Sequence, residues 1–263
     1  MRTPGLAGRG VRSHGAILHR GSLFRRVMKP VPTTNRLLSA LSATDLDALR
    51  PHLDAAPLDA GQVLHEPYQP IGHVWFPRRG MVSLLTPMRD GTHVETAEVG
   101  PEGMVGLELV LGGERATSLG VVRVPGEAAR IEAGPFRRAL GDQPGLRRLL
   151  GRYALARAGQ LAQNAACARV HEVEGRLASR LLMVQAAVHG AASFPLTHEG
   201  AAEMLGARRP TVSSAASKLQ RAGLIACAYG TFTVLDPEGL DAASCGCHRA
   251  IREGYDWHIG GGD

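Results

Sequence analysis

LTHEGAAEMLGARRPTVSSAASKLQRAGLI, residues 196–225, has the pattern of two short helices joined by a glycine turn. Thr197 is a favourable N-cap for the first helix, and Gly206 suits the turn that ends it. The second helix begins at the arginine pair 208–209, and Pro210 is tolerated in its first turn, where amide protons have no intrahelical partner. The apolar positions of this helix repeat with helical spacing, at Val212, Ala215, Ala216 and Leu219. The stretch therefore predicts a helix-turn-helix.

The outward face of the second helix carries arginine, lysine and small hydroxyl side chains, which suit a groove lined with phosphates and base acceptors. We expect Thr197 to contact a phosphate, Arg209 to read a guanine, and Arg208 and Lys218 to meet phosphates. The predicted DNA-binding residues are Thr197, Arg208, Arg209, Thr211, Ser213, Ser214 and Lys218. The alternative is a small helical subdomain whose exposed arginines are only solvated.

Two β-prone runs follow, at 224–228 and 231–235, around Tyr229-Gly230. They predict a β-hairpin. A helix, a turn, a basic helix and then a hairpin is the order of a winged helix-turn-helix.

At this point the sequence resembles a known family. AEMLGARRPTVSSAASKLQRAGLI and GTFTVLD (230–236) are similar to the DNA-binding domain of the Crp/Fnr regulators, the bacterial transcription factors related to the cyclic-AMP receptor protein. A weaker resemblance runs from about Asn35 to Pro237. It implies a sequence-specific regulator rather than an enzyme, which binds a palindromic operator as a homodimer, with double-stranded DNA and RNA polymerase as partners. Pro210 and Ser214 replace a base-contacting glutamate and an arginine of the cyclic-AMP receptor protein, which predicts a different operator.

The fold class that we predict is α+β, with a β-roll, a long dimerisation helix and a C-terminal winged helix-turn-helix. Short β-prone runs at 73–76, 81–85, 93–99 and 120–124 alternate with glycine and proline, as in an antiparallel roll. Helices are expected at 36–50, 135–140 and 144–169. The predicted divisions are a disordered basic extension (1–30), the β-roll (31–141), the dimerisation helix (142–170), the winged helix-turn-helix (171–240) and a Cys/Gly-containing tail (241–263).

The formal charge of +6 does not by itself support DNA binding. Residues 1–29 contain seven basic residues and no acidic one, so the remaining chain sums to −1. The local cluster of Arg208, Arg209, Lys218 and Arg221 must therefore carry the attraction to DNA. Residues 1–27 could be a nonspecific DNA tether, a functionless or transit-like tail, or untranslated sequence before a start at Met28.

The long helix places apolar residues at helical spacings, at Leu146, Leu149, Leu150, Tyr153, Leu161, Ala165 and Ala168. Such a stripe commonly packs on its own domain. The family resemblance instead favours pairing with a second copy, in a short coiled coil because Arg157 and Gln160 lie near the seam.

The family's cyclic-nucleotide pocket uses a Gly-Glu-Leu motif and an Arg-Ser pair. The matching residues here are 103–109 and 114–117, where Arg115 is the candidate effector-binding arginine, Ala116 has no hydroxyl, and Glu108 is displaced by one position. We expect no cyclic nucleotide, and either an unrelated effector or none; the alternative is a cyclic-nucleotide-responsive sensor.

The four cysteines, at 167, 227, 245 and 247, do not form a secreted disulfide framework, and no apolar run is long enough to span a membrane. A reducing cytoplasm fits best. Cys245, Cys247 and His248 lack an obvious fourth ligand, so we expect a solvated tail with no metal and no cofactor, against the alternative of a zinc or redox site. A metal-dependent cupin-like enzyme, using His65, His73, His93, Glu95 and Glu98, is the alternative from another class.

Overall fold

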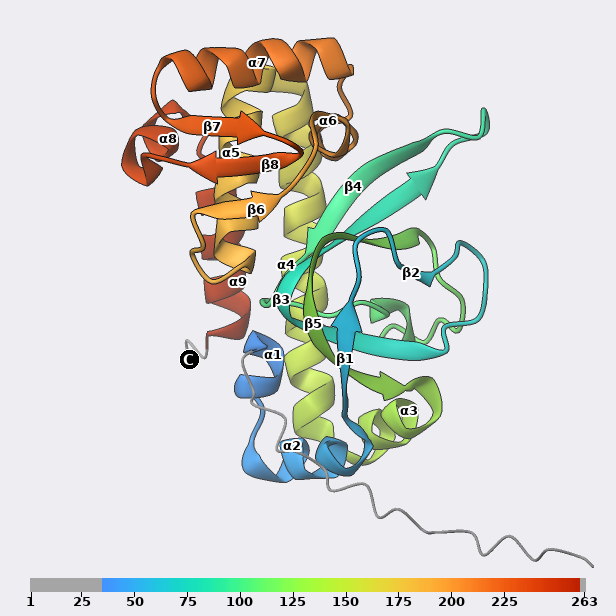
Figure 1. Cartoon of the computed structure of the whole chain (residues 1–263). Coiled ribbons are helices and arrows are strands. Elements are labelled where there is room, and N and C mark those ends of the chain that lie inside the picture. Colours follow the sequence, from blue (N-terminus) through green and yellow to red (C-terminus); the bar gives the residue numbers. More distant parts are fainter. Residues whose placement is uncertain (1–34, 261–263) are drawn as a thin grey trace, which may run out of the picture. The chain divides into compact units, whose positions relative to one another are not determined.

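The computed structural model describes residues 35–260, so the predicted basic extension lies outside the described residues. The N-terminal half is an antiparallel sheet with strand order β1-β5-β3-β4, and β2 also pairs with β5 (Figure 1). Its strands are β1 (Asp54–Leu58), β2 (Val63–His65), β3 (His73–Pro87), β4 (His93–Val99) and β5 (Leu119–Glu132). The predicted β-roll is confirmed.

The predicted runs 73–76 and 81–85 are one strand, β3, which bends in the middle. Gly80 has φ 92°, and a Cβ built on it would lie 2.6 Å from the Val124 carbonyl oxygen. Only glycine fits this close approach of β3 to β5. The register shifts between Pro77 and Val82 allow the long strand to contribute to both ends of the roll.

Helices pack against one end of the roll. They are α1 (Arg36–Ser39), α2 (Ala43–Leu49), α3 (Ala133–Asp142) and the long α4 (Pro144–Val170), with short 3-10 turns η1 (Arg50–His52) and η2 (Leu107–Leu109). The first half of α4 is buried in its own domain: Leu146, Leu149, Leu150 and Tyr153 share a core with Phe76 and Phe136. The Tyr153 hydroxyl donates to the Met104 carbonyl at 3.0 Å.

Arg157 and Gln160 do not lie at an outer seam of α4, as the sequence had suggested. Both are buried, at 5 % and 2 % exposure, and face β4. The Arg157 guanidinium donates to the Glu98 carbonyl at 2.7 Å. The reason is that their hydrogen-bonding partners are about sixty residues away in the sequence, where helical spacing gives no information.

The second half of the chain is a winged helix-turn-helix, as predicted. It consists of α5 (Val173–Ala187), β6 (Ser193–Pro195), α6 (His198–Leu205), α7 (Arg209–Arg221), β7 (Ile225–Ala228) and β8 (Thr231–Val234), and its small sheet has the order β6-β8-β7. Tyr229 and Gly230 both have positive φ, 49° and 73°, which suits a two-residue hairpin turn.

The expected solvated tail is wrong. Residues 237–259 form α8 (Pro237–Ala243) and α9 (Cys247–Ile259), and α9 packs against α4. Ile251, Tyr255 and Ile259, each four residues apart, are buried in the β-roll core, and the Tyr255 hydroxyl donates to Gln160 Oε1 at 2.8 Å. None of the described helices is both long and apolar enough to cross a membrane.

Candidate nucleic-acid interface

The geometry of α6 and α7 is set by two local features. The Thr197 hydroxyl accepts the Gly200 amide at 2.9 Å and so begins α6. Gly206 ends this helix with φ 56°, in the left-handed region. The apolar side of α7 is then buried through Val212, Ala215, Ala216 and Leu219. The opposite side of α7 is therefore held outward.

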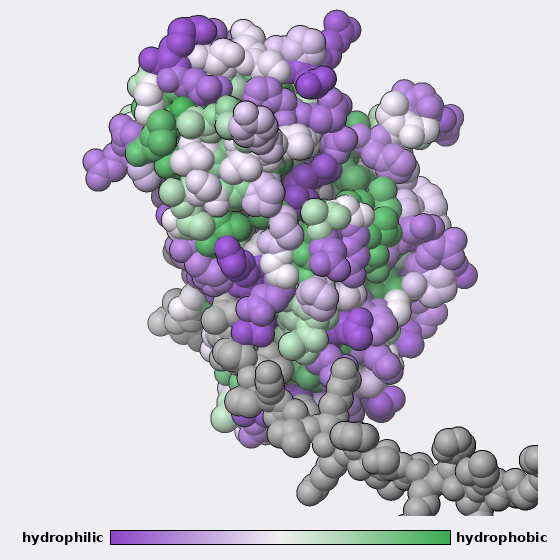
Figure 2. All heavy atoms as spheres, in the orientation of Figure 1, coloured by the Kyte–Doolittle hydropathy of each residue, from purple (hydrophilic) through white to green (hydrophobic). Residues whose placement is uncertain are grey.

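That outward side is polar and open. Figure 2 shows mostly hydrophilic and intermediate residues over α7. All the predicted DNA-binding residues except Ser213 are exposed: Thr197, Arg208, Arg209, Thr211, Ser214 and Lys218.

Two of the basic side chains have acidic neighbours at the surface. Arg209 Nε lies 3.8 Å from Glu199 Oε2, and Lys218 Nζ lies 3.0 Å from Glu174 Oε2. Exposed pairs of this kind are worth little, and salt screens them. Both cations are therefore free to exchange these carboxylates for phosphates.

Ser213 is the exception among the predicted residues, because it is half-buried. Its hydroxyl lies 3.0 Å from His198 Nδ1, so it joins α7 to α6. Thr197, similarly, uses its hydroxyl for the α6 cap. These two residues position the helices.

The wing was not included in the sequence-based site, although its turn was recognised. A pocket of about 370 Å³ lies between the wing and the starts of α6 and α7, lined among others by Thr197, Arg209, Gln220 and Gly230. Tyr229, at the tip of the wing, is fully exposed. The signal that could have added the wing to the predicted site was Tyr229, an aromatic residue in a tight turn.

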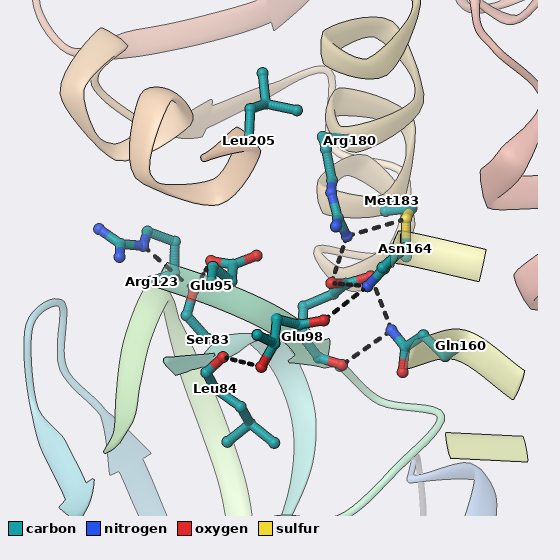
Figure 3. Close-up of polar contacts among 12 residues, drawn as sticks. Ser83, Leu84, Glu95, Glu98, Arg123, Gln160, Asn164, Arg180, Met183 and Leu205 are labelled. Atoms are coloured by element: carbon teal, nitrogen blue, oxygen red, sulfur yellow. Dashed lines mark hydrogen bonds and ion pairs between the residues drawn. The ribbon is translucent and has the colours of Figure 1, made fainter. Parts of the chain in front are cut away.

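A buried polar cluster joins this domain to the β-roll (Figure 3). Glu98 of β4 is 1 % exposed and forms an ion pair with Arg180 of α5. Gln160 of α4 donates to Glu98 Oε1 at 2.8 Å, and Asn164 donates to the Thr96 carbonyl at 3.1 Å. Burial acts to raise the pKa of Glu98, but the Arg180 charge and the hydrogen bonds from Arg180 and Gln160 hold it below its ordinary value.

Glu95 lies beside this pair, and its pKa is shifted in the opposite direction to that of Glu98. It accepts a hydrogen bond from the Ser83 hydroxyl, yet burial raises its pKa to about 7. Arg123 of β5 donates to the same hydroxyl at 3.3 Å and reaches Glu203 of α6 at 2.7 Å. The first helix of the helix-turn-helix is therefore tied directly to the sheet.

The cupin-like alternative does not assemble. Glu95 and Glu98 are engaged in the junction, and within residues 35–260 the histidines and glutamates of the β-roll form no group that could hold a metal. The positions of these histidines and glutamates along the strands do not bring their side chains together around one possible metal ion.

The β-roll contains its own pocket of about 470 Å³, lined among others by His65, Glu108, Arg157 and Leu161. Glu108 accepts from the Thr117 amide and hydroxyl, both at 2.9 Å. His65 is buried with neither ring nitrogen hydrogen-bonded, and burial lowers its pKa. Arg115, the candidate effector-binding residue, is not in the lining. It donates instead to the Tyr68 carbonyl at 2.8 Å.

The C-terminal cysteines have the partners that the sequence did not supply. Cys245 and Cys247 lie with Cys167 and His171 of the α4 end, and the four ligand atoms are all within 4.8 Å of one another. His248 turns away, and its Nε2 lies 2.9 Å from Asp241. The sequence alone offered no further candidate ligand, because Cys167 and His171 come from about 75 positions earlier in the chain.

Two family models match the chain. Residues 56–143 match the cyclic nucleotide-binding domain, and residues 175–243 match the Crp-like helix-turn-helix domain. The chain belongs to the Crp/Fnr family of transcriptional regulators. Its β-roll, long helix and winged helix-turn-helix are the architecture of that family.

Solved structures of other proteins share the fold of this Crp/Fnr regulator. FixK2 from Bradyrhizobium japonicum is 16 % identical, with a TM-score of 0.63 over 73 % of this chain and 98 % of that one. The c-di-GMP-responsive global regulator CLP of Xanthomonas campestris is 17 % identical, with a TM-score of 0.59 over 73 % and 99 %. A putative Crp/Fnr transcriptional regulator from Eubacterium rectale is 16 % identical, with a TM-score of 0.60 over 81 % and 97 %. A comparison with curated proteins gave no match.

Proposed function

We propose that this Crp/Fnr regulator binds a palindromic DNA site as a homodimer, with α7 of each copy in the major groove. The observation that supports this most strongly is the division of α7 into a buried apolar side and an exposed basic side. Two such helices related by a two-fold axis would read half-sites about 34 Å apart. We also propose that the protein acts in the cytoplasm and that it contacts RNA polymerase there.

Arg209 is the proposed base-reading residue. It stands in the first turn of α7, is exposed, and has only a long contact to Glu199. A bidentate contact to guanine contributes about 1–3 kcal/mol of discrimination. Arg208 and Lys218, at the two ends of the exposed side, are assigned to phosphates. Thr211 and Ser214 are assigned to the side of α7 that faces the bases. Thr197 and Ser213 instead fix the positions of α6 and α7.

The dimer contact that we propose is the outer side of α4. Leu155, Ala158, Ala162 and Ala165 are exposed there, and their spacing follows a heptad. Leu155 is 60 % exposed. Small residues at such a seam let two helices approach closely, and pairing removes the exposed leucine from water. This seam differs from the predicted stripe, whose first half is used by the β-roll core.

For the β-roll we propose an effector other than a cyclic nucleotide, or none. Cyclic nucleotides carry a phosphate that needs a cationic partner when it is buried. Arg115 is directed to the Tyr68 carbonyl, and Glu108, which lines the pocket, adds a negative charge to its wall. Arg157 also lines the pocket, but its guanidinium already donates to the Glu98 carbonyl and to Gln160. The buried ring of His65 offers a neutral polar contact instead.

The test is selection of bound fragments from genomic DNA by the purified full chain. We expect a palindromic consensus. Arg209→Ala should relax the preference at one position in each half-site, with a loss of about 1–3 kcal/mol there. Lys218→Ala should weaken all sequences equally and reduce the salt slope by about 1.

Arg138→Ala is the matched control, because Arg138 is exposed on α3, in the β-roll domain. It should leave binding unchanged. Uniform weakening by both α7 variants would contradict the assignment of Arg209. Absence of any enriched sequence would contradict the proposed function itself.

A further inference from the structure

Four side chains with metal-binding atoms meet where α4 ends and α9 begins. Cys167 lies in the last turn of α4, and His171 is the C-cap residue that follows it. The His171 amide donates to the Cys167 carbonyl at 3.1 Å, which keeps the two residues together. Cys245 and Cys247 flank Gly246, which precedes α9. Cys167 Sγ lies 3.6 Å from Cys245 Sγ, and Cys247 Sγ lies 3.4 Å from His171 Nδ1.

These two separations are close to the edges of a tetrahedral zinc site, and all four ligand atoms lie within 4.8 Å of one another. Zinc binds thiolate sulfur at about 2.3 Å and imidazole nitrogen at about 2.0–2.1 Å, which places two ligand atoms about 3.5–3.8 Å apart at the tetrahedral angle. A disulfide would need its sulfur atoms about 2.05 Å apart. The sulfur atoms of Cys167 and Cys245 are held at the spacing of co-ligands.

The surrounding backbone fixes the cluster. Gly246 has φ 72°, so the chain reverses there and both neighbouring cysteines face the end of α4. The Cys245 amide donates to the Gly175 carbonyl at 3.0 Å, which fastens this turn to α5. A side chain at Gly175 would crowd that amide, with its Cβ 3.3 Å away.

Polar groups around the sulfur atoms suit thiolates. The Gln163 amide donates to Cys247 Sγ at 3.1 Å, and the Ser179 hydroxyl lies 3.1 Å from Cys245 Sγ. Cys247 is in the first turn of α9, where the helix dipole favours negative charge. Such outer contacts orient the ligands of a metal site.

We propose that Cys167, His171, Cys245 and Cys247 bind one Zn²⁺ ion in a closed, structural Cys₃His site. Three thiolates and one imidazole are a soft donor set that suits zinc. Four protein ligands leave no open position for catalysis. Cys247 is buried, whereas His171 is exposed and gives the ion access from solvent.

The site would hold the C-terminal helix in place. It joins the end of α4 to the turn before α9, and the same turn contacts α5 of the DNA-binding domain through Gly175. The bound ion would therefore fix the connection between α4 and α5, where the β-roll half of the chain passes into the winged helix-turn-helix.

The test is metal analysis of the full chain, purified in reducing buffer with zinc supplied during expression. We expect one zinc per chain, and a tetrahedral thiolate spectrum when Co²⁺ replaces it. Cys245→Ser and His171→Ala should each lose the bound metal or its tetrahedral spectrum. Cys227→Ser is the matched control, because this half-buried cysteine lies in β7, outside the cluster, and should keep full occupancy.

Wild-type protein that is isolated without metal but takes up one Zn²⁺ with the Co²⁺ spectrum would also support the site. If a variant does not fold, the Co²⁺ titration of the wild type decides alone. The proposal is overturned if the reduced wild type takes up neither metal. It is also overturned if Cys245→Ser keeps the wild-type spectrum, or if a Cys167–Cys245 disulfide forms and its reduction restores no metal binding.

Discussion

Removing the cation from the buried Glu98–Arg180 pair should destabilise the fold in a pH-dependent way. Arg180→Met introduces an unbranched apolar side chain and leaves Glu98, 1 % exposed, without its counter-charge. Breaking one side of a buried ion pair costs about 3–5 kcal/mol. Glu98 can limit this cost by taking up a proton. At pH 7, about 2.5 pH units above its unfolded value of 4.5, protonation costs about 3.4 kcal/mol.

The sign follows from the direction of each pKa. In the wild type the pKa of Glu98 lies below 4.5, so its stabilisation is fully present above that pH and is lost only in stronger acid. In the variant the pKa rises, so stability falls as pH increases from 4.5. The loss caused by Arg180→Met should therefore be about 3 kcal/mol at pH 7 and about 1.4 kcal/mol at pH 5.5.

The assay is urea unfolding followed by circular dichroism at both pH values, at one salt and protein concentration. Both proteins should carry Glu95→Gln, so that titration of this neighbour does not contribute. Adding Glu98→Gln to Arg180→Met should restore most of the stability, because the carboxylate that lost its counter-charge is then removed as well. An equal loss at the two pH values, or no recovery in the combined variant, would refute the reasoning.

Three further outcomes follow from the structure. Glu95 has its pKa raised to about 7, so its burial destabilises the fold increasingly as pH rises from 4.5; Glu95→Gln should match the wild type in urea unfolding at pH 4 and exceed its stability by up to about 3 kcal/mol at pH 8. Ala162→Glu introduces charge at the centre of the proposed α4 seam and should give monomers in light scattering, whereas Arg138→Glu, at an exposed position on α3 away from the seam, is the control. Calorimetric titration with cyclic AMP or cyclic GMP should show no micromolar binding, and a clear isotherm would contradict our interpretation of Arg115.

The helix-turn-helix was predictable because its signals are local. Thr197, Gly206 and Pro210 each act within one turn of their own helix, and the inward positions of α7 follow a single period. The β-roll was predictable as a class, but not the union of two runs into β3, since that depends on how closely Gly80 approaches β5.

Most of the features that the sequence did not reveal depend on distant partners. The sequence pattern placed Arg157 near a coiled-coil seam, whereas the fold brings it beside Glu98. Cys245 and Cys247 have no further candidate metal ligands nearby in the sequence, and the fold brings Cys167 and His171 to them. The buried positions of α9 do follow helical spacing, but glycines and cysteines around them gave the segment the composition of a tail.

Arg157 is shared by the β-roll pocket and by the junction with the DNA-binding domain. It lines the pocket, and it donates to the Glu98 carbonyl and to Gln160, which itself donates to the Glu98 carboxylate that pairs with Arg180. A ligand can change DNA binding only if it favours one arrangement of this chain of contacts over another. The physical requirement is therefore energetic coupling between Arg157 and Arg180, which a double-mutant cycle of DNA affinity measures directly. We expect Arg157→Met and Arg180→Met to be non-additive by about 0.5–3 kcal/mol, since both act on Glu98. Additive effects would mean that the pocket and α5 do not communicate through this carboxylate, whatever the pocket binds.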